Sequence, residues 1–148
     1  MPKIIKDGAV VEDNWKGRLL DLEAYNEAVQ AGAAPAEDIA VQLEPDQPPS
    51  ELTGDLAAIP MVAIHFPGFM DGRGFSYARE LRERGYVGEI RAVGDFMRDQ
   101  LGYLVRCGFN AFDFAENVNL EAALGSLGEL TQQYQADVLQ AEPLFRRR

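Results

Sequence analysis

Cysteine is nearly absent from this sequence, because Cys107 is the only one among 148 residues. A disulfide within the chain is therefore excluded, and zinc sites or iron–sulfur clusters that need several thiolates cannot form from one copy. Histidine is equally scarce, since His65 stands alone. The sequence thus predicts no metal site and identifies no cofactor.

Long apolar runs are also missing. No stretch of about 18 apolar residues occurs, and the first residues lack the apolar block of a secretory signal. We therefore expect a cytoplasmic protein with no membrane partner.

Positive charge is in short supply, with 14 Lys and Arg residues against 24 Asp and Glu residues and a net charge of -10. Such a chain repels phosphate backbones, so we expect no nucleic-acid partner. The arginines are concentrated, because seven of them lie between Asp71 and Arg106. This clustering predicts that they share one region of the fold.

The length and the average composition, with 47% hydrophobic residues, fit one globular domain over residues 1–148. Within it we expect an N-terminal hairpin and helix (1–37), a βα core (38–136) and a C-terminal tail (137–148). An Asp-Gly turn and the spacing of apolar residues define the expected elements. In chain order these are a hairpin over 4–11, a helix over 21–31, a surface connection over 38–50, a short helix over 51–58, a strand over 61–66, a helix over 76–84, a strand over 89–93, a helix from about 95 to 108, a strand over 111–114 and a helix from about 120 to 134.

Strands that alternate with helices of about ten residues indicate an α/β protein with a mainly parallel sheet, flanking helices and a βαβαβ core. Two architectures fit this rhythm: an open sheet, which we favour, and a partial β/α barrel. The strands are too few to close a ring of eight. Both architectures place ligands at the carboxyl ends of the strands.

The first candidate ligand site is the loop that follows the strand over 61–66. Its glycines allow close backbone approach, Arg73 supplies a forked cation and Ser76 stands near a helix start, a combination that suits a small oxyanion. A tight turn followed by a capped helix explains the same residues without a ligand. The candidate residues here are Asp71, Gly72, Arg73, Gly74 and Ser76.

A second cluster follows the next strand and consists of Arg91, Asp95, Asp99 and Gln100. Parallel neighbours would bring it beside the first loop, where Arg73 and Arg91 could face one anion. The alternative is an ion-pair network that only orders the two loops.

Two reactive side chains have ordinary explanations as well. His65 lies near the end of a buried strand, where a lone histidine serves as a hydrogen-bonded core residue more often than as a base. Cys107 lies late in a helix, away from the helix amino terminus that would stabilise a thiolate, and so fits a packing role.

Two blocks of sequence resemble one bacterial family of unknown function. The first runs from Phe66 to Arg79 and continues with Leu81, Arg82 and Gly85. The second runs from Gly88 to Asp95 and continues with Asp99, Gln100, Leu101, Arg106, Cys107, Gly108, Phe109, Ala111 and Phe112. The ending from Pro143 to Arg148 is also similar to the family's usual close.

Members of that family are encoded beside the haem-containing subunit of assimilatory sulfite reductase and are labelled as oxidoreductases of sulfite reduction. The resemblance implies an accessory protein or oxidoreductase of that process, which binds a small oxyanion or an anionic cofactor group and has a reductase subunit as its partner. One cysteine cannot hold a sirohaem and iron–sulfur centre, so catalysis by this chain is left open. The alternative is a non-catalytic module that assembles or stabilises sulfite reductase.

Overall fold

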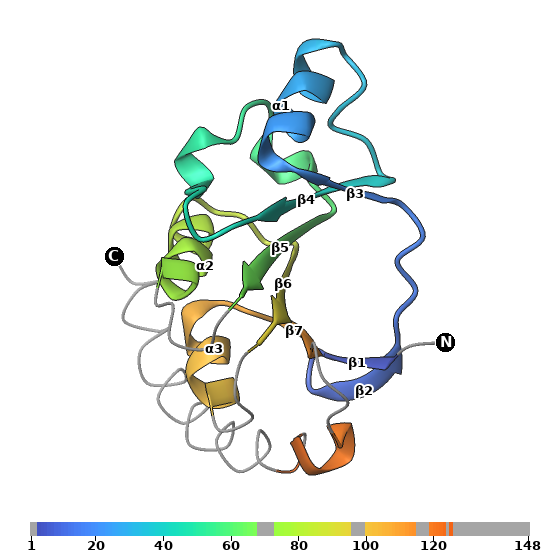
Figure 1. Ribbon diagram of the computed structural model, residues 1–148, viewed down its shortest axis with the longest axis vertical. Coiled ribbons are helices and arrows are strands. Elements are labelled where there is room, and N and C mark those ends of the chain that lie inside the picture. The colour runs from blue at the N-terminus through green and yellow to red at the C-terminus, as the bar shows by residue number, and fades with distance from the viewer. Residues whose placement is uncertain (1–2, 68–72, 96–99, 115–118, 124, 126–148) are drawn as a thin grey trace, which may run out of the picture.

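A computed structural model of the chain describes residues 3–67, 73–95, 100–114, 119–123 and 125. It confirms the α/β class, with an open, mostly parallel sheet of seven strands in the order β2-β1-β7-β6-β5-β4-β3 (Figure 1). The elements are β1 (Lys3–Lys6), β2 (Ala9–Glu12), β3 (Arg18–Asp21), α1 (Leu22–Gln30), β4 (Ile39–Leu43), β5 (Met61–Phe66), α2 (Arg73–Glu83), β6 (Glu89–Gly94), α3 (Leu101–Cys107) and β7 (Ala111–Phe114), with short 3-10 helices over Pro49–Glu51 and Leu56–Ala58.

The five strands from β3 to β7 are parallel, and each lies beside the next one along the chain. This order never reverses, so the sheet lacks the switch point at which doubly wound proteins bind ligands. It is instead the order found in β/α barrels, here left open. The carboxyl ends of all five strands meet at one edge, which we call the carboxyl edge.

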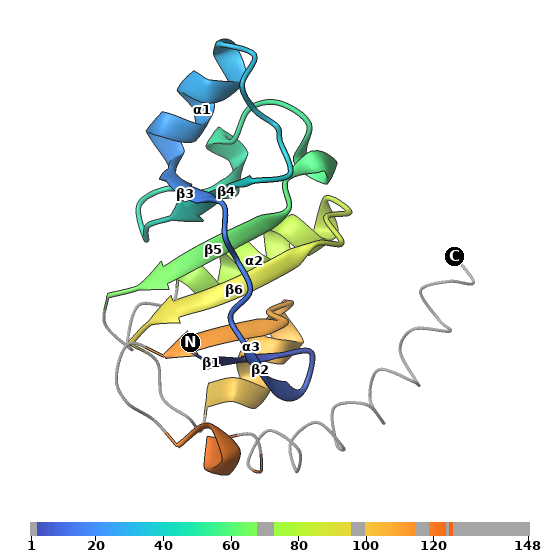
Figure 2. The same ribbon diagram turned by 90° about the vertical axis from the view of Figure 1, so that its right-hand side faces the viewer.

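The two faces of the sheet are covered differently. Helices α2 and α3 lie on one face, and the segment over residues 13–17, which we call the strap, crosses the other (Figures 1 and 2). Alternate strand residues such as Val62, Ile64 and Phe66 join the core beneath the helices, where each buried side chain contributes about 1.5 to 3 kcal/mol. Their neighbours Ala63 and Arg91 are buried on the strap face.

The predicted N-terminal hairpin is confirmed. Asp7 and Gly8 both adopt positive φ, at 51° and 80°, as a two-residue turn between twisted strands requires. Strand β1 also pairs with β7 in antiparallel orientation, with Ile5 opposite Phe112. The hairpin therefore extends the main sheet.

The helices agree with the sequence in part. Asp21 caps α1 by accepting a hydrogen bond from the Ala24 amide at 2.8 Å, as predicted. Helix α2 begins at Arg73, three residues before the predicted start at Ser76, and Gly85 follows its end at a φ of 90°. The described part of the next helix begins at Leu101.

Three expectations were wrong. Residues 38–50 do not form only a surface connection, because Ile39–Leu43 is strand β4, buried between β3 and β5. Strand β3 was not predicted. The expected helix over 51–58 is replaced by two 3-10 turns, since Gly54 between them has a φ of 80° that interrupts a helix. Of the last predicted helix, residues 120–123 are helical and most of the remainder lies outside the described residues.

Candidate functional site

Strands β5 and β6 end together at the carboxyl edge. Phe66 lies opposite Gly94, and the Asp95 amide donates to the Phe66 carbonyl at 2.7 Å. This bond ties the first residue after β6 to the last residue of β5. The strand ends that precede the two predicted ligand loops therefore lie side by side.

The first turn of α2 contains three of the predicted site residues. Arg73 is exposed, and no acidic residue occupies this turn. Gly74 is buried and packs against the Phe66 ring so closely that a Cβ at this position would lie 2.6 Å from it. The Ser76 hydroxyl donates to the Arg73 carbonyl at 2.9 Å, so Ser76 does not cap the helix start.

Two of the remaining predicted residues flank the second loop. Asp95 directly follows β6, and Gln100 directly precedes α3. Asp71, Gly72 and Asp99 lie outside the described residues.

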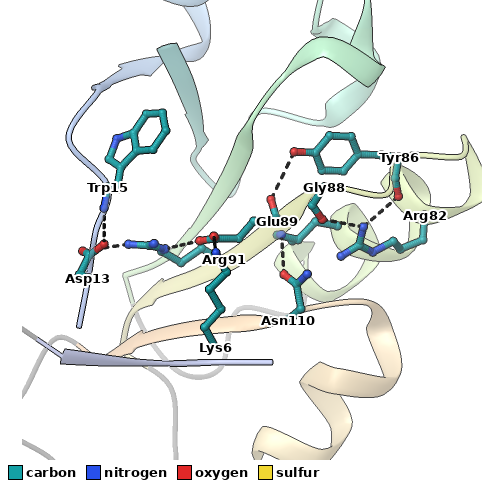
Figure 3. Close-up of polar contacts among 10 residues, drawn as sticks. Lys6, Asp13, Trp15, Arg82, Tyr86, Gly88, Glu89, Arg91 and Asn110 are labelled. Carbon is teal, nitrogen blue, oxygen red and sulfur yellow. Dashed lines mark hydrogen bonds and ion pairs between the residues drawn. The ribbon is translucent and has the colours of Figure 1, made fainter. Parts of the chain in front are cut away.

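Arg91 lies elsewhere. It occupies the middle of β6 on the strap face, opposite to α2, and its side chain is only 7% exposed. Its Nε donates to Glu89 at 2.7 Å and its Nη1 to Asp13 on the strap at 3.0 Å (Figure 3). The guanidinium is thus held away from Arg73, and it pairs with carboxylates that the sequence did not connect to it.

This buried network extends to both sides of Arg91. Lys6 on β1 pairs with the second oxygen of Glu89 at 2.9 Å (Figure 3). Burial alone would lower the pKa of Arg91, but its bonds to Asp13 and Glu89 outweigh that effect and raise the pKa. Burial also raises the pKa of the nearby Asp113 carboxyl, against the opposing effect of Arg91. The network therefore fastens the strap to the sheet.

A pocket of about 380 Å³ opens beside this network, between the hairpin, the strap and β6. Its lining combines apolar side chains with Trp15 and the two cations, Lys6 and Arg91. Because carboxylates pair with both cations, this wall is charge-balanced and offers little attraction to an anion.

His65 and Glu44 form a pair at the carboxyl edge. His65 Nδ1 lies 2.6 Å from Glu44 Oε1, and the two side chains are 31% and 37% exposed. The second oxygen of Glu44 accepts a hydrogen bond from Gln42 at 3.0 Å. This arrangement of imidazole, carboxylate and amide orients the histidine ring from one side.

Sequence reasoning missed the strap-face groups Lys6, Asp13, Glu44, Glu89 and Asp113. The available signal was alternation in β6, where Glu89 and Arg91 lie on either side of the apolar Ile90 and so share one face. That pattern could predict the face. It could not identify the partners, since Asp13 and Arg91 are 78 residues apart.

The opposite end of the sheet, the amino edge, carries structural contacts. Arg82 donates to the Tyr86 and Gly88 carbonyls at 2.9 Å (Figure 3) and to the Gly108 carbonyl at 3.0 Å. Asn110 accepts from the Ile90 amide at 2.9 Å. These bonds join the turns that precede β6 and β7. In β/α barrels, the amino-terminal ends of the strands contribute to stability, whereas the active site lies at the carboxyl ends.

Other potential reactive groups are few among the residues placed by the structure. No group of three or more His, Cys, Asp or Glu side chains there could hold a metal ion. Cys107 is buried, in keeping with a packing role, and Arg79 Nη2 approaches its sulfur at 3.6 Å. Across the described ranges, no helix is both long enough and apolar enough to cross a bilayer.

Comparison with known proteins gives one match. The sequence profile of a bacterial protein of unknown function (DUF934) matches residues 40–145. Comparisons with curated proteins and with solved structures gave no significant match.

Proposed function

The chain belongs to DUF934, a bacterial family of unknown function, and from this premise we propose that it is an accessory protein of assimilatory sulfite reduction that binds a small oxyanion at the carboxyl edge. The sulfur context comes from the resemblance described above, whose family is encoded beside the reductase. The proposal gives this chain a binding role and leaves electron transfer to the reductase that it serves.

The observation that carries the proposal is the junction of β5 and β6. Their paired ends and the bond from the Asp95 amide to the Phe66 carbonyl place the carboxyl ends of two neighbouring parallel strands side by side. β/α barrels, whose strand order this sheet shares, bind ligands at the carboxyl ends of their strands.

Arg73 is the cation best placed to meet an oxyanion there. It begins α2, an 11-residue helix whose first-turn amides and dipole favour negative charge. No acidic side chain occurs from Arg73 to Ser76. Arg91 is left out of the proposed ligand set, because Asp13 and Glu89 already hold its guanidinium.

Titration calorimetry with sulfite, sulfate and phosphate tests the proposal. We expect binding to the wild-type chain and a loss of about tenfold or more in affinity for Arg73→Ala, since a hydrogen bond to a charged group contributes about 1.5 to 3 kcal/mol. The matched control is Arg84→Ala at the exposed far end of α2, which should bind as the wild type does. Failure of all three anions to bind would overturn the anion site.

The alternative, a module that assembles or stabilises sulfite reductase, has a separate observation in its favour. Three large apolar side chains are exposed among the described residues, and Val87 is the most exposed of them at 90%. Exposed apolar side chains that lie together are candidates for a partner surface, whereas single ones are ordinary. A complex with the reductase that survives Arg73→Ala but is lost on deletion of residues 144–148 would favour the module over the anion site.

A further inference from the structure

His65 reaches across the carboxyl edge between its two neighbouring strands. Its Nδ1 faces Glu44, which follows β4, whereas its Cδ2 faces Gly94 at the end of β6. A Cβ on Gly94 would lie 3.0 Å from that carbon and 2.5 Å from the Phe66 carbonyl oxygen. Glycine at this position therefore leaves room for the ring, and Nε2, which is bonded to Cδ2, lies on the side of β6.

The hydrogen bonds around Glu44 fix the tautomer of the neutral ring. A carboxylate only accepts, so Nδ1 carries the proton that it donates to Glu44, and Nε2 keeps its lone pair. Gln42 holds the other carboxylate oxygen, and the Gln47 side chain accepts from the Glu44 amide at 2.9 Å. Among the residues that the structure places, Nε2 has no hydrogen-bond partner.

Because Nε2 of His65 accepts a hydrogen bond, it favours a ligand whose oxygen carries a hydrogen atom. The charged groups on the adjacent elements include the Glu44 and Asp95 carboxylates, which act alike on two anions of equal charge, so a proton on the ligand is what distinguishes such anions here. A ligand oxygen that carries hydrogen can donate to Nε2, whereas an oxygen without hydrogen would face a lone pair and leave both groups unsatisfied.

We infer that His65, held by Glu44, selects a protonated oxyanion, such as hydrogen sulfite or hydrogen phosphate, over fully ionised sulfate. This inference rests on the oxyanion site of the proposed function and names the form of the ligand. It assigns His65 a role in specificity at the carboxyl ends of β4, β5 and β6.

Hydrogen phosphate and sulfate are the sharpest pair of probes. Both are tetrahedral dianions of similar size in mildly alkaline buffer, and they differ by one proton. Calorimetry on the wild-type chain should give an affinity for phosphate about tenfold or more above that for sulfate. For His65→Phe, which keeps a ring and removes the acceptor, the two affinities should become equal.

Glu44→Gln should reduce the preference, because the amide no longer requires a proton on Nδ1. The control Glu83→Gln removes one exposed carboxylate from the far end of α2 and should leave the preference unchanged. Nitrogen NMR of this single histidine gives an independent readout, with Nδ1 protonated and Nε2 unprotonated in the neutral wild-type ring.

The outcomes separate the two proposals. Equal affinities of the wild type for phosphate and sulfate, or a preference that survives His65→Phe, would overturn the selection by His65 and leave the oxyanion site standing. A wild-type chain that binds neither anion would overturn both. A neutral ring protonated on Nε2 would remove the proposed acceptor.

Discussion

Arg91 shows how one residue can combine a high desolvation cost with a structural role. It is the one charged side chain classed as buried within the described ranges, and it is compensated by Asp13 and Glu89. Removing one member of such a network leaves uncompensated charges, and this loss exceeds the net value of the pairs themselves. At this position the guanidinium joins the strap to β6.

We expect Arg91→Met to lower the free energy of unfolding by about 3 kcal/mol, because it leaves two partly buried carboxylates without their cation. Urea unfolding followed by circular dichroism measures the change. The control Arg84→Met, at an exposed arginine, should alter stability by less than about 0.5 kcal/mol. A similar small effect for both variants would contradict the role given to Arg91.

Replacement of Asp113 is expected to raise the free energy of unfolding, in contrast to replacement of Arg91. Burial raises its pKa above the ordinary value of 3.8, so the folded chain holds this proton more tightly than the unfolded chain does. Ionisation of Asp113 therefore destabilises the fold as the pH rises through the raised pKa. We expect Asp113→Asn to stabilise the protein at neutral pH. This gain in stability should shrink as the pH falls toward the pKa of Asp113 in the unfolded chain.

Unfolding curves for both proteins across the acid range measure this linkage. Equal stabilities at every pH, or an advantage of Asp113→Asn that grows in acid, would show that the carboxyl is not destabilised by burial.

At the scale of elements, the connections at the two ends of the sheet have different tasks. Arg82 on α2 holds the turns before β6 and β7 through three carbonyl groups, and its guanidinium lies 5.8 Å from the centre of the Tyr86 ring. The carboxyl edge instead presents His65, Arg73 and the Asp95 junction. Stability and ligand binding should therefore respond to different substitutions.

Arg82→Met should lower the free energy of unfolding by at least about 2 kcal/mol, because several charge-assisted hydrogen bonds are lost together. Chemical denaturation measures this, and Arg106→Met on the exposed side of α3 is the control. At a temperature where the variant stays folded, its affinity for the oxyanion should equal that of the wild type. A selective loss of binding without a loss of stability would contradict the division between the two edges.

Local signals predicted some elements well. The Asp7-Gly8 turn and the cap at Asp21 depend on neighbouring residues only, and both formed as expected. Strand β4 was missed because prolines follow its short apolar run, and its burial depends on pairing with β3 and β5. Local sequence does not record such pairing.

At the scale of the whole molecule, the βα rhythm predicted the mainly parallel sheet, with β5 and β6 as neighbours. It did not predict that the strap would cross the second face, or that Asp13 would bind Arg91 across 78 residues of sequence. Contacts of this kind follow from topology, which brings distant segments together after the strands have assembled. The prediction that Arg73 and Arg91 face one anion did not include the contact between Arg91 and Asp13.

The central claim is that the carboxyl edge of the sheet is the ligand site. Amide NMR spectra recorded during a sulfite titration test it most directly. We expect the shifts to concentrate at residues such as Phe66, Gly74 and Asp95, and to be absent from Gly88 and Asn110 at the amino edge. Shifts confined to the amino edge or to the strap pocket, or no shifts at any concentration, would contradict the account.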